Sequence, residues 1–267
     1  MVFARLPRLS TIVAVLSMAA VSTLPSAIAQ TKTSPADEPA ANATAKNDDG
    51  KADDASAKKS DKAKKSDADG WSPLFNGKDL TGWKSTEFGG EGEVYFEKGN
   101  VVITQGVQLS GITSTRKDLP KSNYEVQFEA QRAAGSDFFI GFTFPVKESS
   151  CSLICGGWGG GVCGLSSLDG MDAVENETTS YSNFENGKWY KVRLRVTDDR
   201  IEAWLDKHKI VDVETAGHKI GVRFEVDASR PMGFATFQST GWIRNARMRT
   251  LPAAGKAGAK DAQKSPK

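Results

Sequence analysis

Residues 189–213 read Trp189-Tyr-Lys-Val-Arg-Leu-Arg-Val-Thr-Asp-Asp-Arg-Ile-Glu-Ala-Trp-Leu-Asp-Lys-His-Lys-Ile-Val-Asp-Val213. Large apolar residues alternate with charged ones from Trp189 to Val196, which is the period-two pattern of a half-buried β-strand. Polar turns at residues 198–199 and 206–208 separate this strand from two more, at 201–205 and 210–213. The segment therefore predicts a three-stranded antiparallel meander.

Further strand patterns lie on both sides of this meander. Residues 123–130 alternate cleanly, whereas residues 137–146 are apolar on both faces, as expected of a central strand covered on each side. The remaining predicted strands are 93–97 and 101–104 (a hairpin around Lys98-Gly99-Asn100), 221–226, 233–238 and 242–251. Apart from one turn near residues 169–174, helical periodicity is missing. The sequence thus predicts an all-β domain of two antiparallel sheets, a jelly-roll sandwich.

The N-terminal residues 1–29 have the features of a signal peptide. Two arginines precede a mostly apolar run, and Ala27-Ile28-Ala29 matches the small-x-small cleavage pattern, so we expect cleavage before Gln30. The apolar run is shorter than the ~20 residues that span a bilayer, which predicts no membrane span. An uncleaved anchor is the alternative. The protein is expected to be exported, to the periplasm or beyond the cell.

Composition divides the rest of the chain. Residues 30–70 contain no aromatic, Val, Leu, Ile or Met residue and are expected to form a disordered linker, and residues 252–267 a disordered basic tail. Residues 71–251 suit one folded domain. The formal net charge of +2 divides into +2 for the signal, −1 for the linker, +3 for the tail and −2 for the domain. A basic nucleic-acid-binding domain is therefore not expected.

The chemically richest segment is Cys151–Tyr181, which holds the three cysteines, a glycine-rich run around Trp158 and four carboxylates within residues 169–177. A hairpin that turns at residues 158–160 would place Cys155 directly opposite Cys163. The two thiols would then form either a cross-strand bridge or a pair of buried free cysteines. A metal site at the cysteines is not expected.

Several motifs resemble a known family. Leu74-Phe-Asn-Gly-Lys-Asp-Leu-Thr-Gly-Trp83 resembles the opening signature of the 3-keto-disaccharide hydrolase domain, also called domain of unknown function 1080. Residues 135–139, 156–160, 175–179 and 189–190 are similar to a planctomycete-type branch of it, and the resemblance covers nearly all of residues 71–251. It implies an exported protein with a concanavalin A-like or LamG-like jelly roll that acts on carbohydrate.

One departure from the family concerns the strand after residues 138–144. Better-known members carry Glu-Ile-Gln there, whereas this chain has Leu153-Ile154-Cys155-Gly156. Any activity that depends on that glutamate cannot be carried over. A 3-keto sugar nevertheless needs little from an enzyme, because its ketone acidifies the neighbouring C–H. One base and one donor at the ketone oxygen then suffice to expel the glycosidic substituent, with no cofactor.

We predict three catalytic carboxylates, Asp137, Glu175 and Glu177, near Trp158. Asp137 begins the most apolar strand, where partial burial would raise its pKa into the range useful for acid–base catalysis. Its alternative role is to accept hydrogen bonds from the backbone of a turn at the end of the strand. Trp158 is predicted to stack on a sugar face, or else to plug the end of the sandwich. The predicted substrate-binding residues are Trp158, Gly157, Gly159 and Asn176, with the glycines offering backbone N–H groups.

The acidic segment 169–177 has three interpretations. Glu175 and Glu177, two apart on an extended segment, would face the same way as an acid pair of the kind that glycosidases use. Alternatively, Asp169, Asp172, Glu175 and Asn176 would supply oxygens to Ca²⁺, or the loop would simply be solvated. His208 and His218 are expected at the surface. The leading prediction is an exported hydrolase acting by carboxylate acid–base chemistry on a glycosidic substrate, with a 3-keto-glycoside as one option. The alternative is a non-catalytic, lectin-like carbohydrate-binding or envelope-associated module.

Overall fold

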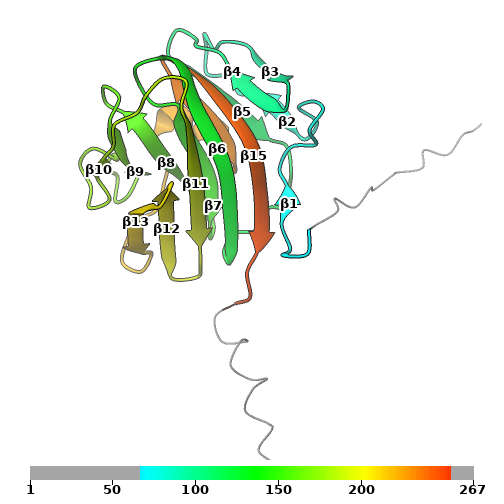
Figure 1. Ribbon diagram of the computed structural model, residues 1–267. Coiled ribbons are helices and arrows are strands. Elements are labelled where there is room, and N and C mark those ends of the chain that lie inside the picture. Colours follow the sequence, from blue (N-terminus) through cyan, green and yellow to red (C-terminus); the bar gives the residue numbers. More distant parts are fainter. Residues whose placement is uncertain (1–66, 254–267) are drawn as a thin grey trace, which may run out of the picture. The chain divides into compact units, whose positions relative to one another are not determined.

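The computed structural model describes residues 67–253, which form two antiparallel sheets and one short 3-10 helix. The eight-stranded sheet has the order β13-β12-β11-β6-β15-β4-β3, with β1 also paired to β15, and the seven-stranded sheet has the order β10-β9-β8-β7-β14-β5-β2 (Figure 1). The elements are β1 Ser72–Pro73, β2 Trp83–Ser85, β3 Val94–Glu97, β4 Asn100–Ile103, β5 Leu109–Ser114, β6 Tyr124–Gly135, β7 Ile140–Val146, β8 Ser149–Gly157, β9 Val162–Ser166, β10 Ser180–Tyr181, β11 Trp189–Val196, β12 Arg200–Leu205, β13 His208–Glu214, η1 Phe224–Ser229, β14 Gly233–Phe237 and β15 Ser239–Thr250. The all-β jelly-roll prediction is confirmed.

The predicted meander is present as β11, β12 and β13, which pair in sequence order at one side of the eight-stranded sheet. Strand β11 also pairs with β6, so that Val192 lies opposite Phe128 and Leu194 opposite Val126. The predicted hairpin of β3 and β4 is likewise present. Alternation along each strand sets this register, because a slip of one residue would turn every apolar side chain to the outside.

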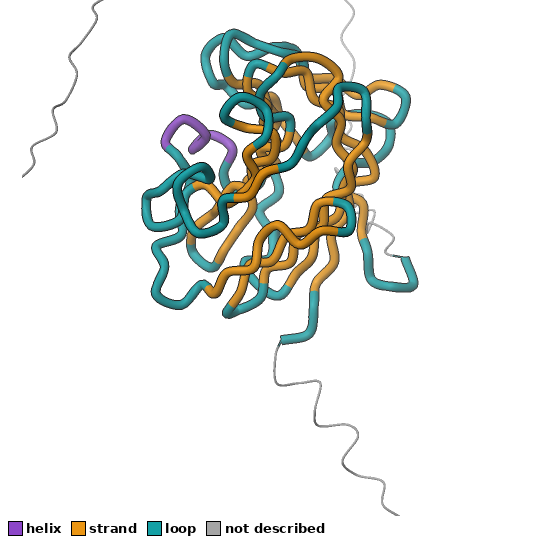
Figure 2. Tube along the Cα trace, turned by 60° about the vertical axis from the view of Figure 1, so that its left-hand side comes forward, coloured by secondary structure: helices purple, strands orange, loops and turns teal. Residues whose placement is uncertain are grey.

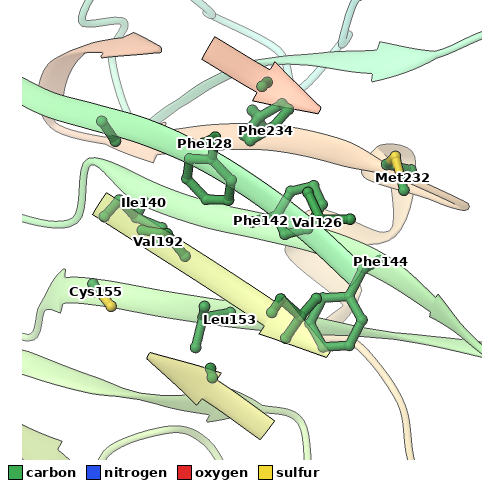
Figure 3. Close-up of a cluster of buried hydrophobic side chains, with 14 of the residues drawn as sticks. Val126, Phe128, Ile140, Phe142, Phe144, Leu153, Cys155, Val192, Met232 and Phe234 are labelled. Carbon is green, nitrogen blue, oxygen red and sulfur yellow. The ribbon is translucent and has the colours of Figure 1, made fainter. Parts of the chain in front are cut away.

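The core fills the space between the two sheets. Phe142 of β7 and Phe234 of β14 stack with ring centroids 4.7 Å apart, and Phe128 of β6 meets both rings edge-on from the opposite sheet, at 5.3 and 5.1 Å (Figure 3). All three side chains are buried. Each such ring contributes about 2 kcal/mol or more through burial, so this aromatic contact is a main support of the sandwich.

Strands β8 and β9 form the predicted cysteine hairpin. Cys155 lies directly opposite Cys163, and a β-bulge after Cys155 precedes the turn at residues 158–161. Cys151, Cys155 and Cys163 are buried free thiols on the core side. Burial raises the pKa of the Cys151 thiol to about 12 and that of Cys155 well above its usual value, so both behave as small apolar core residues.

The predicted strand at residues 221–226 and the predicted end of the linker at residue 70 both differ from the structure. The strand predicted for residues 221–226 is wrong, because this region is an irregular segment that leads into η1, with Val226 and Ser229 buried at the three-residue spacing of a 3-10 turn. Figure 2 shows this short helix (purple) on the outside of the strands. Residues 67–70, which composition assigned to the linker, form a hydrogen-bonded turn before Trp71.

The predicted signal peptide and most of the predicted linker and tail lie outside the described residues. Within the described part of the chain, no helix is long and apolar enough to cross a membrane.

A charged network covers the outer face of the eight-stranded sheet. The fully buried carboxylate of Glu125 on β6 accepts hydrogen bonds from Arg193 (2.5 Å) and Arg195 (2.8 Å) of β11 and from Arg249 (2.5 Å) of β15. Burial by itself would raise the pKa of Glu125, but the three guanidinium groups outweigh it and hold the pKa at about 2. This carboxylate therefore ties three adjacent strands together.

Replacing this carboxylate by an amide, Glu125→Gln, should lower the free energy of unfolding at pH 7 by about 3 kcal/mol, because three cations remain without their anion. A carboxylate whose pKa is held low stabilises the fold fully above its unfolded value, near 4.5, and loses this contribution as the pH falls towards 2. The melting temperature of the variant should therefore change less than that of the wild type between pH 5 and pH 2.

The matched control is Glu148→Gln, which removes an exposed carboxylate paired with Lys121. Its effect on unfolding should stay below about 0.5 kcal/mol. An equal fall in melting temperature between pH 5 and pH 2 in the wild type and in Glu125→Gln would contradict the stabilising role of the Glu125 carboxylate.

Candidate functional site

The outer face of the seven-stranded sheet consists mainly of small side chains. Because side chains alternate along each strand, the residues opposite one another across β5, β14, β7, β8 and β9 form rows on this face. One row is small or apolar and contains Gly111, Ala235, Gly141, Ile154 and Gly164. The next row is rich in hydroxyl groups and contains Thr113, Gly233, Thr143, Ser152 and Ser166. Such a face leaves room for other groups to lie directly on the sheet.

Two glycines in these rows mark where such groups lie. A Cβ atom on Gly141 would come within 2.7 Å of the Phe138 ring, and one on Gly164 within 3.0 Å of Thr178 in the segment 167–179 between β9 and β10, here called the acidic loop. A side chain at either position would therefore force the overlying group, Phe138 or Thr178, to move. The glycines thus allow Phe138 and the acidic loop to cover parts of the sheet, with an uncovered area left between them.

That uncovered area is a pocket of about 350 Å³, here called the Asp137 pocket. Its volume lies in the range of small-molecule sites. Phe138 and Phe237 form an apolar wall, with stacked rings 5.9 Å apart. The pocket is lined by Gln108, Leu109, Asp137, Phe138, Ser152, Ile154, Trp158, Ser166, Arg223, Glu225, Val226 and Phe237.

The structure brings Asp137 and Trp158 together at this pocket, as the sequence predicts. The Asp137 carboxylate accepts hydrogen bonds from the backbone N–H groups of Phe138 (2.7 Å) and Gly159 (3.0 Å), so it also has the turn-acceptor role that was its alternative. Trp158 lies in the β8–β9 turn at a φ of 49° and is 41% exposed, which leaves part of its ring free to contact a ligand. Gly157 lies beside this carboxylate, where an added Cβ would be 3.9 Å from Asp137 Oδ1.

The opposite wall contains a charged pair that the sequence did not indicate. Arg223 binds the Glu225 carboxylate through Nε (3.1 Å) and Nη2 (2.6 Å), and its Nη1 donates to Asp172. Hydrogen bonding to Arg223 lowers the pKa of Glu225, and the same contact raises the pKa of Arg223. Ser166 donates in turn to Asp172 at 3.3 Å. The pocket thus presents a guanidinium group held rigidly between two carboxylates.

The expected acid pair does not form, because residues 173–178 are turns and not an extended segment. Asn176 enforces these turns: its amide donates to the carbonyls of Leu165 (2.7 Å) and Asp172 (2.8 Å), and its Oδ1 accepts from Thr178. Glu175 accepts from the backbone of Asp172, while Glu177 pairs with His218. The prediction that Glu175 and Glu177 face the same way is wrong, and neither they nor Asn176 line the Asp137 pocket.

The oxygens considered for Ca²⁺ also diverge. Asp169 accepts from His218 (2.6 Å) and from the backbone of Lys219, whereas Asp172 binds Arg223. Among residues 67–253, no group of three or more His, Cys, Asp or Glu side chains is arranged to hold a metal ion. The carboxylates of this loop are instead bound to cationic side chains and backbone N–H groups.

A larger hollow of about 680 Å³ lies on the outer face of the eight-stranded sheet. It combines Trp71 with Gln127, Glu129, Arg193 and Arg247. Most of its charged groups are engaged by neighbouring side chains: Arg193 binds Glu125, Glu129 binds Arg244, and Arg247 lies over the Trp71 ring. The Asp137 pocket, with an acid, a guanidinium and three aromatic rings at one place, is the stronger candidate for chemistry.

His218 gives a pH-dependent contact that can be tested. It bridges Asp169 and Glu177 of the acidic loop, and hydrogen bonding to Asp169 raises its pKa. A raised pKa contributes stability that is complete below about pH 6.5 and is lost as the pH rises through the folded value. His218→Gln should therefore lower stability more at pH 5.5 than at pH 8.5, by less than about 1 kcal/mol because the site is partly exposed. Thermal melts at both pH values measure this, and an equal loss at both would refute the bridge.

A family model described as the 3-keto-alpha-glucoside-1,2-lyase-like domain matches residues 70–249. A structure assigned to the glycosyl hydrolases, from Parabacteroides distasonis ATCC 8503, is 19% identical with a TM-score of 0.45, covering 69% of this chain and 95% of that one. The carbohydrate-binding module CBM66 from Bacillus subtilis is 10% identical with a TM-score of 0.41, covering 64% and 97%.

A structure from work on endo-acting O-glycanases of the human gut microbiota is 10% identical with a TM-score of 0.48, covering 67% of this chain and 100% of that one. No match was found among the curated proteins. The family model spans almost the whole described sandwich, from the turn before Trp71 to the last residues of β15. This chain therefore belongs to the family of 3-keto-alpha-glucoside-1,2-lyase-like domains.

Proposed function

We propose that this protein cleaves a glycosidic bond in a 3-keto-glycoside, with the reacting sugar bound in the Asp137 pocket. The observation that carries the proposal is that a carboxylate, a guanidinium group and exposed aromatic surface line one pocket of about 350 Å³. Membership of a family described as 3-keto-alpha-glucoside-1,2-lyase-like supports this class of substrate. We also propose export, on the strength of the signal-like residues 1–29.

The proposed reaction is an elimination. A base takes the proton on C2, next to the ketone, and the electron pair of that C–H bond forms the C1–C2 double bond by way of an enolate. The C1–O bond breaks, and the leaving oxygen takes up a proton to become the free alcohol. Because the ketone supplies the acidity, the step needs no external cofactor. Addition of water across the new double bond afterwards would make the net reaction a hydrolysis.

The pocket offers a base and a partner for the ketone oxygen, and solvent water supplies the proton that the leaving oxygen takes up. Asp137 is the proposed base, because two backbone N–H groups fix its carboxylate while each oxygen keeps further acceptor capacity towards the pocket. Arg223 is the proposed partner of the ketone oxygen, since its three hydrogen bonds to carboxylates leave N–H donors that can stabilise an enolate. Trp158 and the Phe138–Phe237 wall would contact the apolar faces of the sugar.

A second candidate is a lectin-like module without catalysis. Ser152 and Ile154 are the residues of β8 that face the pocket, so this strand contributes no ionisable group. The related strand in better-known members of the family that the sequence resembles carries Glu-Ile-Gln, which alternation would place with both polar residues on one face. The absence of that glutamate here favours binding without cleavage, and the test below separates the two functions.

The test uses the full chain with a 3-keto-glucoside that bears a nitrophenyl leaving group, and with the parent glucoside. We expect release from the 3-keto compound only, because the parent lacks an acidic C–H. Asp137→Asn keeps the shape of the side chain and removes the base, so release should fall by about 100-fold or more. Release is followed by absorbance, and a melting curve shows that the variant is folded.

Three glutamate variants serve as controls. Glu175→Gln and Glu177→Gln remove the carboxylates outside the pocket lining, and Glu148→Gln removes one in an exposed ion pair. All three should retain release. Full activity in Asp137→Asn would remove Asp137 from the mechanism. Binding of both glucosides without release from either, in the wild type, would establish the lectin-like function.

A further inference from the structure

A third hollow, of about 560 Å³, borders the same β8–β9 turn and is here called the Arg132 hollow. Its walls are the three consecutive glycines Gly159–Gly161, Gly135, Ser136, and Ser182, Asn183, Phe184 and Asn186 of the segment before β11. Arg132, near the end of β6, is also part of its lining. The Asp137 pocket and the Arg132 hollow therefore share the turn that carries Trp158.

Arg132 is buried, with 6% of its surface exposed, yet every acceptor that it contacts is neutral. Its Nε donates to the side-chain oxygen of Asn186 (2.6 Å), Nη2 to the carbonyl of Phe184 (3.0 Å), and Nη1 to the carbonyl of Asp137 (3.3 Å). Between residues 67 and 253, no carboxylate lies within ion-pair distance of it. These contacts use three of the five N–H donors of the guanidinium group.

The other semi-buried arginines of this domain are different. Arg193, Arg195 and Arg249 share Glu125, and Arg223 is bound to Glu225 and Asp172. A guanidinium group stays protonated in proteins, and burying a charge without an opposite charge is costly. Carbonyl and amide dipoles reduce this cost but do not neutralise the charge, so an anion entering the hollow gains a desolvated cationic partner.

Two glycines, one in β8 and one in the β8–β9 turn, lie close to this cation. A Cβ atom on Gly160 would lie 3.5 Å from Arg132 Nη1, and one on Gly156 would lie 3.7 Å from it. Any larger side chain at either position would therefore contact the guanidinium group. Hydrogen-bonding groups of Ser136, Ser182 and Asn183 complete the polar lining.

We propose that the Arg132 hollow is a subsite for an oxyanion carried by a sugar, either the carboxylate of a uronic acid or a sulfate ester. Both anions present paired oxygens to a guanidinium fork. The proposal rests on the proposed function in one respect, because the sugar that bears the anion belongs to a saccharide that extends from the Asp137 pocket past the β8–β9 turn. It makes acidic glycans the substrate class.

The test introduces a competing carboxylate beside the hollow by a substitution that leaves Arg132 itself unchanged. Gly161 is suited to this, because its backbone is outside the positive-φ region that requires glycine and an added Cβ would meet only the carbonyl of Ser182, at 3.4 Å. Gly161→Glu introduces a carboxylate, and Gly161→Gln is the uncharged control of the same size. The full chain and both variants are titrated calorimetrically with methyl glucuronide, glucose 6-sulfate and neutral methyl glucoside.

The wild type should bind at least one anionic sugar about tenfold or more tightly than methyl glucoside, as expected for one charge-assisted contact. This preference should be lost in Gly161→Glu and be clearly stronger in Gly161→Gln, whose side chain has the same size and no charge. Preference for the glucuronide alone identifies a carboxylate subsite, and preference for the sulfate ester alone identifies a sulfate subsite. Equal binding of neutral and anionic sugars, no binding of any sugar, or equal behaviour of the two variants would overturn the proposal.

Arg132→Met is a second variant, for which a melting curve is needed because Arg132 also holds residues 184–187 against β6. If it folds, it should lose the anion preference and keep the affinity for methyl glucoside; a folded variant that kept the preference would also overturn the proposal. Asp137→Asn separates the two proposals, since it leaves the backbone carbonyl that binds Arg132 unchanged. It should therefore lose 3-keto-glucoside cleavage and keep the anion preference. In the wild type, an anion preference without any cleavage would count against the proposed function and not against the subsite.

Discussion

The pleat of the β-strand is the constraint on which this structure depends. Successive side chains point to opposite faces, so a strand that gives one face to the core has only the other face for anything else. The interlocked rings of Phe128, Phe142 and Phe234 fix both sheets in this way. The buried cysteines follow the same rule, because Cys151 and Cys155 alternate with the outward-facing Ser152 and Ile154. Chemistry is thus confined to the outer faces and to the loops at their ends.

The two outer faces meet this constraint differently. On the eight-stranded sheet, long charged side chains neutralise one another and lie over tryptophan rings, as Arg244 does over Trp189 at 3.9 Å. That face is covered by its own side chains. On the seven-stranded sheet the outward residues are small, and cover comes from Phe138, the acidic loop and η1. Cover supplied by separate segments leaves space between them, which is why the pocket with aromatic walls lies on this sheet and brings together residues distant in sequence, such as Asp137 and Arg223.

The alternation of apolar and polar residues was sufficient to predict strands and hairpins formed by residues that are close in the sequence. Alternation identified the meander and the hairpin of β3 and β4, and counting residues across the β8–β9 turn placed Cys155 opposite Cys163. It failed where distant groups decide the conformation. Residues 221–226 alternate like a strand but lie across the sheet, with Arg223 bound to Asp172 fifty-one residues away. Likewise, the backbone contacts of Asn176 bend the segment that was expected to aim Glu175 and Glu177 together, and no spacing in the sequence signals those contacts.

Asp137 connects the two sites that border the β8–β9 turn. Its carboxylate accepts a hydrogen bond from the N–H of Gly159 in that turn, and its backbone carbonyl accepts one from Arg132. The Ser239 hydroxyl of β15 accepts from the Asp137 N–H and donates to the Asp137 carbonyl. The proposed base and the buried cation are therefore both held by contacts of one residue. Ser239 and Gly159 are further partners of this residue, so the position of Asp137 depends on β15 and on the β8–β9 turn as well as on Arg132.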